Sequence, residues 1–498
     1  VREPPAPLPP APGQPATVSA NPAEGPEIFL ACWSDGSVTA LCGHVDLGTG
    51  LATALTQIVA EELSLAPERV HMLLGSTAAA PNQGATIASA SIQIHAQPLR
   101  QAAAQAQAWL AAHGWPAPDG AAVTLALDPA APLKAPSEYR LVGQSLPRVD
   151  LPAKMLGEAS FVHDLRLPGM LHGRLVRPPY AGADHGAFVG RTLEAVDESS
   201  VAHIPGVRAV VVIGDFIAIA AEREEQAEAA MRQLAVRWKP WPGMPGTEDL
   251  AAAVRANPAT ARRLVDEGQV DAALAAVTQR LDRQYLWPYQ MHASIGPSCA
   301  VAQWLAADAD RPARLSVWAG TQNPHVLRAD LALLTGLRDV DIEVIRLEAA
   351  GCYGRNGADD VAADAALLAR ALPGLPVRVQ LTREQEHAWE PKGAAQLMQV
   401  DGGLGADGLA AAYDFRTSYP SNAAPTLALL LTRTIEPRAV AFEMGDRTAI
   451  PPYEYPAMRV TAHDMAPILR ASWLRGVSAL PNSFAHESYV DELATAAG

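Results

Sequence analysis

A junction between a strand pattern and a helix pattern, interrupted by glycines, constrains the fold of this chain most strongly. In "RLEAAGCYGRNGADDVAADAALLARAL" (346–372), a strand-type run over 342–347 leads through a glycine loop into an Ala/Leu-rich helix. Glycine permits positive φ and lets another group approach the main chain closely. We therefore expect the backbone itself to be used here, either to cap the helix or to hold a ligand.

The same junction occurs four times along the chain. The loops are "GHVDLGTG" (43–50), "PNQGATIASAS" (81–91), "AGTQNP" (319–324) and "AAGCYGRNG" (349–357). Each precedes a helix pattern, and free N–H groups at a helix start favour an anion. None contains the GKS or GKT of a P-loop, and neither glycine loop spells GxGxxG, so the usual mononucleotide sites are disfavoured. Simple helix caps and a large anionic ligand held by several loops both remain open.

The remaining patterns predict an α+β, multi-domain chain with mixed sheets. Residues 1–26 are Pro/Ala-rich and are typical of a linker. In 27–142, Asp35-Gly36 predicts a hairpin, followed by helices over 51–65 and about 98–113. Segment 143–262 combines short strand patterns with one helix, "REEQAEAAMRQLAVRW" (223–238). In 263–498 strands alternate with helices, which indicates crossover units; the last helix pattern has no C-cap, so we expect the domain to continue beyond residue 498.

Charge and residue counts exclude several function classes. The formal net charge of −15 argues against nucleic acid and anionic membranes as partners. No apolar run approaches a membrane span and no signal peptide is visible, so we expect a cytoplasmic protein. The four cysteines form no CxxC pair and the 13 histidines no HExxH. We therefore expect neither an iron–sulfur cluster in this chain nor a metal held directly by its side chains.

Several longer stretches resemble one known family. "LPAKMLGEASFVHDLRLPGMLHGRLVRPPYAGA" (151–183) is similar to the opening of an a/b hammerhead domain. The stretches at 289–304, 318–337, 351–369 and 469–494 follow in the order of a first molybdopterin-binding domain, and those at 43–63 and 81–92 resemble part of a second. The chain thus resembles the molybdenum-binding large subunit of the xanthine dehydrogenase/aldehyde oxidase superfamily, especially its nicotinate dehydrogenase and isoquinoline oxidoreductase types. In that family the second-domain portion usually follows the first; here it precedes the hammerhead segment.

The resemblance implies an oxidoreductase that hydroxylates an electron-poor carbon with oxygen from water. The resemblance favours an N-heteroaromatic, nicotinate-like substrate, and an aldehyde is the alternative. The cofactor implied is molybdopterin with molybdenum, in its cytosine dinucleotide form, which brings its own metal ligands. Implied partners are a small subunit with [2Fe–2S] clusters, a continuation or second polypeptide carrying the family's catalytic glutamate, and a flavin or cytochrome subunit.

The resemblance also implies site residues. Gln290 matches a glutamine beside the metal, and Arg475 matches an arginine that orients substrate; these are the catalytic candidates. A planar guanidinium suits a carboxylate such as nicotinate. The residues implied for cofactor binding are Gly48, Gly50, Ala88, Ser89, Ser91, Gln290, Gly351, Cys352, Tyr353, Gly354 and Arg475.

The chain departs from the family pattern at several positions. Cys352 replaces a glycine, Thr49 stands where a glutamine is common, and Gly357 falls where an acid contacts substrate. Two other functions stay open: a scaffold subunit without catalysis, and a hydrolase with Cys352 as nucleophile. The hydrolase needs a thiol of lowered pKa and a histidine partner, for which His325 and His387 are the candidates.

Overall fold

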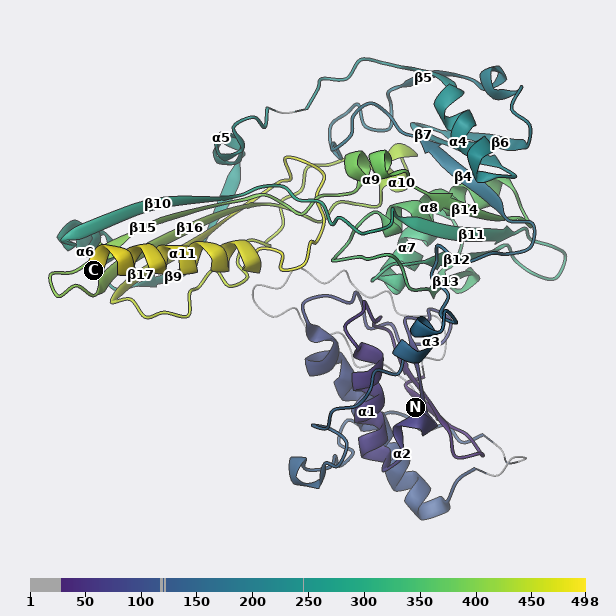
Figure 1. Cartoon of the computed structure of the whole chain (residues 1–498), viewed down its shortest axis with the longest axis horizontal. Coiled ribbons are helices and arrows are strands. Elements are labelled where there is room, and N and C mark those ends of the chain that lie inside the picture. Colours follow the sequence, from purple (N-terminus) through teal and green to yellow (C-terminus); the bar gives the residue numbers. More distant parts are fainter. Residues whose placement is uncertain (1–27, 117–119, 121, 245) are drawn as a thin grey trace.

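The computed structural model describes residues 28–116, 120, 122–244 and 246–498. The expected linker at 1–26 lies outside these residues. The described chain forms three bodies of secondary structure (Figure 1): an N-terminal α/β unit, a seven-stranded sheet, and an elongated five-stranded sheet with a long helix.

The N-terminal unit follows from its apolar pattern. Its elements are β1 (Leu30–Cys32), β2 (Val38–Cys42), α1 (Leu51–Leu63), β3 (Val70–Leu74) and α2 (Ala96–His113). β1 and β2 form the predicted hairpin around Asp35-Gly36. β2 and β3 pair in parallel, and α1 makes the crossover between them. Leu55, Val59 and Leu99, which the helical spacing places on the inner faces, are fully buried.

The seven-stranded sheet has the order β13-β12-β11-β14-β4-β7-β6. Its strands are β4 (Leu171–Val176), β6 (Val207–Ile213), β7 (Phe216–Ala221), β11 (Cys299–Leu305), β12 (Arg314–Ala319), β13 (Ile342–Arg346) and β14 (Pro376–Gln380). β12 and β13 are parallel and joined by α7 (Pro324–Thr335), which confirms the predicted crossover. β4, β6 and β7 come from segment 143–262, so this segment shares one sheet and one core with 263–498.

Helices and small strands surround this sheet. They are α3 (Leu151–Met155), β5 (Leu193–Asp197), α4 (Glu224–Gln233), β8 (Ala235–Trp238), α8 (Ala358–Ala371), α9 (Arg383–Trp389) and α10 (Leu427–Leu431). The predicted helix over 223–238 is wrong in its last third. α4 ends at Gln233, and β8 pairs with β5 through Val236 and Trp238, because these branched and aromatic side chains bury better on a strand than on a helix.

The five-stranded sheet has the order β10-β15-β16-β17-β9. Its elements are α5 (Leu250–Ala256), β9 (Ala259–Glu267), α6 (Val270–Ala276), β10 (Gln279–Trp287), β15 (Gln396–Leu404), β16 (Ala410–Pro420), β17 (Ala457–Met465) and α11 (Ala479–Ala497). α11 lies along one face of the sheet (Figure 1) and buries Tyr489 and Leu493 against it. Among the described residues no helix combines the length and apolar character needed to span a membrane.

Candidate cofactor-binding site

The four strand–loop–helix junctions meet in space. Between the two N-terminal loops, the Val45 N–H donates to Thr86 Oγ1 (3.0 Å), and His44 Nδ1 shares a hydrogen bond with Ser91 Oγ (2.7 Å). Thr86 N–H then donates to the Gln322 carbonyl (3.1 Å), and the Gln322 amide donates back to the Thr86 carbonyl (3.2 Å). Gln322 Oε1 also lies 3.3 Å from the thiol of Cys352. One chain of contacts therefore links all four loops.

The glycine loop 351–354 is held against the segment that carries Arg475. The Arg475 N–H donates to the Tyr353 carbonyl (2.7 Å), and the Arg355 N–H donates to the Trp473 carbonyl (2.8 Å). The Arg475 guanidinium lies over the Tyr353 ring, 5.7 Å from its centroid. The sequence-predicted candidates Tyr353, Gly354 and Arg475 are thus brought together.

Glycine is required at position 354 because another part of the main chain approaches it closely, which the sequence does not reveal. Its φ is +132°, and a Cβ there would lie well inside 3.0 Å of the Trp473 carbonyl oxygen. Gly351, at φ +128°, is closed in by the Tyr353 ring and by Ser294. The space that these glycines leave is filled by the protein's own backbone and rings. On their Cβ side, these glycines allow two segments of the protein to touch; their role in cofactor binding stays a prediction.

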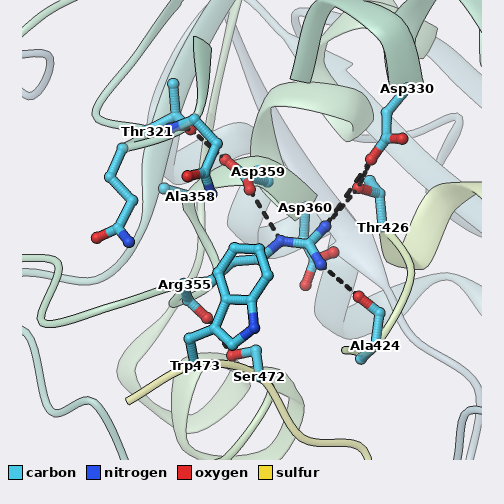
Figure 2. Close-up of polar contacts among 12 residues, drawn as sticks. Thr321, Asp330, Arg355, Ala358, Asp359, Asp360, Ala424, Thr426, Ser472 and Trp473 are labelled. Atoms are coloured by element: carbon cyan, nitrogen blue, oxygen red, sulfur yellow. Dashed lines mark hydrogen bonds and ion pairs between the residues drawn. The ribbon is translucent and has the colours of Figure 1, made fainter. Parts of the chain in front are cut away.

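Arg355 and its polar partners form a network that also holds the glycine loop against the segment that carries Arg475 (Figure 2). Arg355 Nε donates to Asp359 (3.0 Å), and its other nitrogens donate to Thr426 Oγ1 and to the Ala424 carbonyl. Ser472 Oγ donates to the Arg355 carbonyl. Arg355 therefore joins the glycine loop, α8 and the strand-following segments at 424–426 and 472–473.

Two of the four helix starts already carry an anion of their own. Asp46 Oδ1 accepts N–H groups from Gly48 (2.9 Å), Thr49 (2.9 Å) and Gly50 (3.2 Å), and Oδ2 accepts that of Ala52. The first turn of α8 carries Asp359 and Asp360. The expectation of free N–H groups at Gly48 and Gly50 is therefore wrong. Arg148 donates to the Gly48 carbonyl (2.9 Å), and its side chain lies 3.8 Å from where a Cβ on Gly50 would be.

The loop at 81–91 has unusual backbone geometry, and the start of α7 has buried polar atoms without hydrogen-bond partners. Ala88 and Ser89 both have positive φ (58° and 57°), and Ser91 opens a π-helical turn over 91–95 ahead of α2. Within the described part of the chain, both side-chain polar atoms of Asn323 and both ring nitrogens of His325 are buried without a hydrogen-bond partner. Buried polar atoms are normally paired, so this junction fits a polar ligand held by amides and backbone better than a dry core.

Gln290 and Arg475 line one small cavity. Its other lining residues are Trp287, Gly393, Ala394, Tyr419, Leu474, Val477 and Leu480. The Gln290 N–H and carbonyl pair with the main chain of Gly393. The cavity places the two catalytic candidates together, and Arg475 connects it to the glycine loop through the Tyr353 carbonyl. No group of three or more His, Cys, Asp or Glu side chains suited to a metal occurs among the residues described.

The structure argues against the cysteine hydrolase. Cys352 is 7% exposed, and burial raises the pKa of its thiol to about 12. Its sulfur lies 2.5 Å from the Gly354 carbonyl and 3.3 Å from Gln322 Oε1. The nitrogens of the candidate partner His325 have no hydrogen-bond partner among the described residues. A buried thiol of raised pKa is a poor nucleophile.

Some contributing residues were not predicted. Gln322 and His44 belong to predicted loops, but nothing in the sequence marks their side chains as the links between loops. Trp473 acts through its carbonyl oxygen, and Ser294 through a hydroxyl that donates to the Gly351 carbonyl (3.0 Å). Main-chain contacts of this kind leave no residue-type signal.

Comparison with known proteins assigns most of the chain to one kind of domain. Two matches to a molybdopterin cofactor-binding domain cover residues 14–115 and 255–498. A nicotinate dehydrogenase subunit of Pseudomonas putida is 60% identical over 95% of this chain and 42% of its own length. The beta subunit of isoquinoline 1-oxidoreductase of Brevundimonas diminuta is 26% identical over 95% of this chain and 68% of its own.

The fold has a counterpart among solved structures. Quinoline 2-oxidoreductase from Pseudomonas putida 86 matches 72% of this chain and 48% of its own, with a TM-score of 0.55 and 20% identity. The chain thus spans less than half the length of the 60% identical relative and of this structure. Both molybdopterin-binding matches, the 60% identical relative and the fold lead to one conclusion: the chain belongs to the molybdopterin-binding proteins of the xanthine dehydrogenase family.

Proposed function

We propose that this chain is the larger part of the cofactor site of a molybdenum hydroxylase that acts on a nicotinate-like heteroaromatic acid. The observation that carries the proposal is the exposed Arg475 guanidinium, held over Tyr353 beside Gln290 where the four loops meet. The 60% identity to a protein of nicotinate dehydrogenase supports the substrate class. When bound, the molybdenum cofactor would supply two-electron redox chemistry and activate water.

The described residues would hold the cofactor at the loop junction. Ala88, Ser89 and Ser91 would face its phosphate, and Asn323 and His325 offer the buried polar atoms that lack partners. Its cytosine dinucleotide form and a cytoplasmic location belong to the proposal. Of the other candidates, Gly351, Cys352 and Gly354 would act by shaping the loop, while Gly48 and Gly50 would contribute only through the Asp46 turn.

Arg475 would bind the carboxylate of the substrate. A planar guanidinium can donate two parallel hydrogen bonds to a carboxylate, and this would orient the ring with its C–H bond toward the reacting centre. In the overall reaction that C–H becomes C–OH with oxygen from water, and two electrons and two protons leave. The electrons would pass to a [2Fe–2S] protein and then to a flavin or cytochrome. The proton-accepting glutamate would come from a continuation or second polypeptide.

Two measurements on the purified complex test this function. Turnover of nicotinate in ¹⁸O-water should add one ¹⁸O atom to the product. Arg475→Lys should raise KM for nicotinate by about 10- to 100-fold, because a charge-assisted pair contributes about 1.5–3 kcal/mol. KM for an uncharged pyridine aldehyde should change little. A preference for aldehydes with no effect of Arg475→Lys on any acid would favour the aldehyde oxidoreductase instead.

A further inference from the structure

Two buried titratable groups lie directly behind the Trp473–Arg475 segment, and nothing in the proposed reaction uses them. Glu390 follows α9 and is 2% exposed; His292 lies in the loop after β10 and is 4% exposed. The Glu390 carboxyl accepts the His292 N–H (2.7 Å), and its Oε1 lies 4.0 Å from His292 Nδ1. Glu390 Oε2 and His292 Nδ1 have no hydrogen-bond partner among the described residues.

The other ring nitrogen of His292, Nε2, contacts the main chain next to Arg475. His292 Nε2 lies 2.7 Å from the Trp473 carbonyl oxygen. A carbonyl can only accept, so Nε2 carries the proton and Nδ1 presents its lone pair toward Glu390. The same Trp473 oxygen accepts the Arg355 N–H and lies against Gly354. This oxygen atom is therefore one of the contacts that hold the glycine loop against the segment that carries Arg475.

We propose that Glu390 and His292 form a buried positioning pair that holds the Trp473 carbonyl against Gly354 and thereby keeps Arg475 over Tyr353. Glu390 fixes the main chain of His292, and the His292 ring donates to Trp473. Glu390 lines no part of the cavity with Gln290 and Arg475, so it acts through His292 and not on a substrate. That the positioned segment serves a cofactor rests on the proposed function; the positioning itself does not.

The pair works best when both groups are neutral. Burial lowers the pKa of His292 to about 4, and burial raises the pKa of Glu390 to about 7. The charged groups that face Glu390 are Lys392 on its own segment, Glu386 on α9, and His292 when protonated; Lys392 also faces His292. Above about pH 7 Glu390 would ionise, and the cost of burying its charge, together with repulsion from Glu386, would oppose the arrangement that holds Trp473 against Gly354.

The raised pKa of Glu390 determines how its stabilising contribution changes with pH. Glu390 stabilises the arrangement in which the Trp473 carbonyl lies against Gly354. This contribution is complete below the ordinary glutamate pKa of 4.5 and is lost as the pH rises through about 7. Glu390→Gln keeps an oxygen acceptor for the His292 N–H but cannot ionise. We compare the protection of the Arg355 and Arg475 amides from hydrogen exchange in the wild-type protein and in Glu390→Gln. The ratio of wild-type to variant protection should fall by about tenfold or more between pH 5 and pH 8.

Hydrogen exchange at the Arg355 and Arg475 amides, corrected for intrinsic pH dependence, is the readout. It is measured on the full chain with its co-purifying subunits. His292→Gln, whose amide can still donate to Trp473, should keep protection within about twofold of wild type, whereas His292→Leu should lose about fivefold, since one hydrogen bond contributes about 1 kcal/mol. Asp215→Asn is the control, because Asp215 is also buried but accepts the N–H groups of Thr192 and Leu193 and does not face Glu390.

The outcomes separate the two proposals. Equal protection in His292→Gln, His292→Leu and wild type would overturn the positioning pair, as would a wild-type to Glu390→Gln ratio that is constant with pH. If Glu390→Gln fails to fold, the two His292 variants decide. Pterin released on denaturation is assayed on the same samples: no pterin in wild-type protein would refute the proposed function and leave the exchange result standing.

Discussion

Replacement of Gly354 by alanine should separate the glycine loop from the segment that carries Arg475. A Cβ at this position would meet only main-chain atoms: the Trp473 carbonyl oxygen, the Trp473 carbonyl carbon at 2.7 Å, and the Leu474 Cα at 3.1 Å. Main chain cannot rotate away as a flexible side chain can. A non-glycine residue at φ +132° costs about 1–3 kcal/mol, and overpacking costs about 1–3 kcal/mol more. We expect a local destabilisation of about 4 kcal/mol.

A matched glycine provides the control. Gly374 also has a positive φ (+87°) but has nothing within 4 Å of its Cβ direction, so Gly374→Ala should cost about 1 kcal/mol. The difference of about 3 kcal/mol corresponds to roughly 100-fold faster hydrogen exchange in peptides covering 351–357 and 473–476. Exchange in Gly354→Ala within about threefold of that in Gly374→Ala would refute the close approach as the reason for this glycine.

Three further perturbations follow from the site and its supports. Asp46→Ala leaves four N–H groups at the start of α1 without their acceptor and should lower the free energy of unfolding of the N-terminal unit by about 2 kcal/mol in a urea titration, with an unchanged midpoint contradicting the cap. Burial alone would raise the pKa of Glu61, but N–H groups of Leu141, Val142 and Arg140, and then Lys134, lower it to about 2. Its stabilisation is therefore present above 4.5 and lost as the pH falls toward 2, so Glu61→Gln should flatten thermal stability between pH 5 and pH 2.5, and a curve parallel to wild type would count against this. Cys352 should resist iodoacetamide at pH 8 until urea is added; rapid alkylation in the native protein, followed by mass spectrometry, would revive the hydrolase.

Much of the fold could be predicted because its signals are local. Apolar spacing located α1 and α2, Asp35-Gly36 located the β1–β2 hairpin, and strand–helix alternation predicted the β12–α7–β13 crossover. The predicted helix over 223–238 was wrong at its end because β8 depends on a partner, β5, some 40 residues earlier. No local pattern reports such pairing. The sharing of one sheet by segments 143–262 and 263–498 is non-local for the same reason.

The candidate site was predicted in outline but not in mechanism. Gln290 and Arg475 line one cavity, and the Arg475 guanidinium lies over the Tyr353 ring; the functional roles of these residues stay predictions. The neighbours of the glycines could not be predicted, because sequence shows where a close approach is permitted and not what approaches. At Gly354 it is the Trp473 carbonyl, and at Gly48 and Gly50 the acceptor is Asp46, two to four residues away. Asp46 carried a signal, since an acid just before a helix start is a common cap.

The most direct test of the central claim is molybdenum and pterin analysis per chain. The protein is purified with its co-purifying subunits from cells supplied with molybdate. A cofactor site at the junction of the four loops predicts close to one molybdenum and one releasable pterin per chain. A folded complex with neither would contradict it, and would leave the chain as a scaffold that keeps the family's loops without their cofactor.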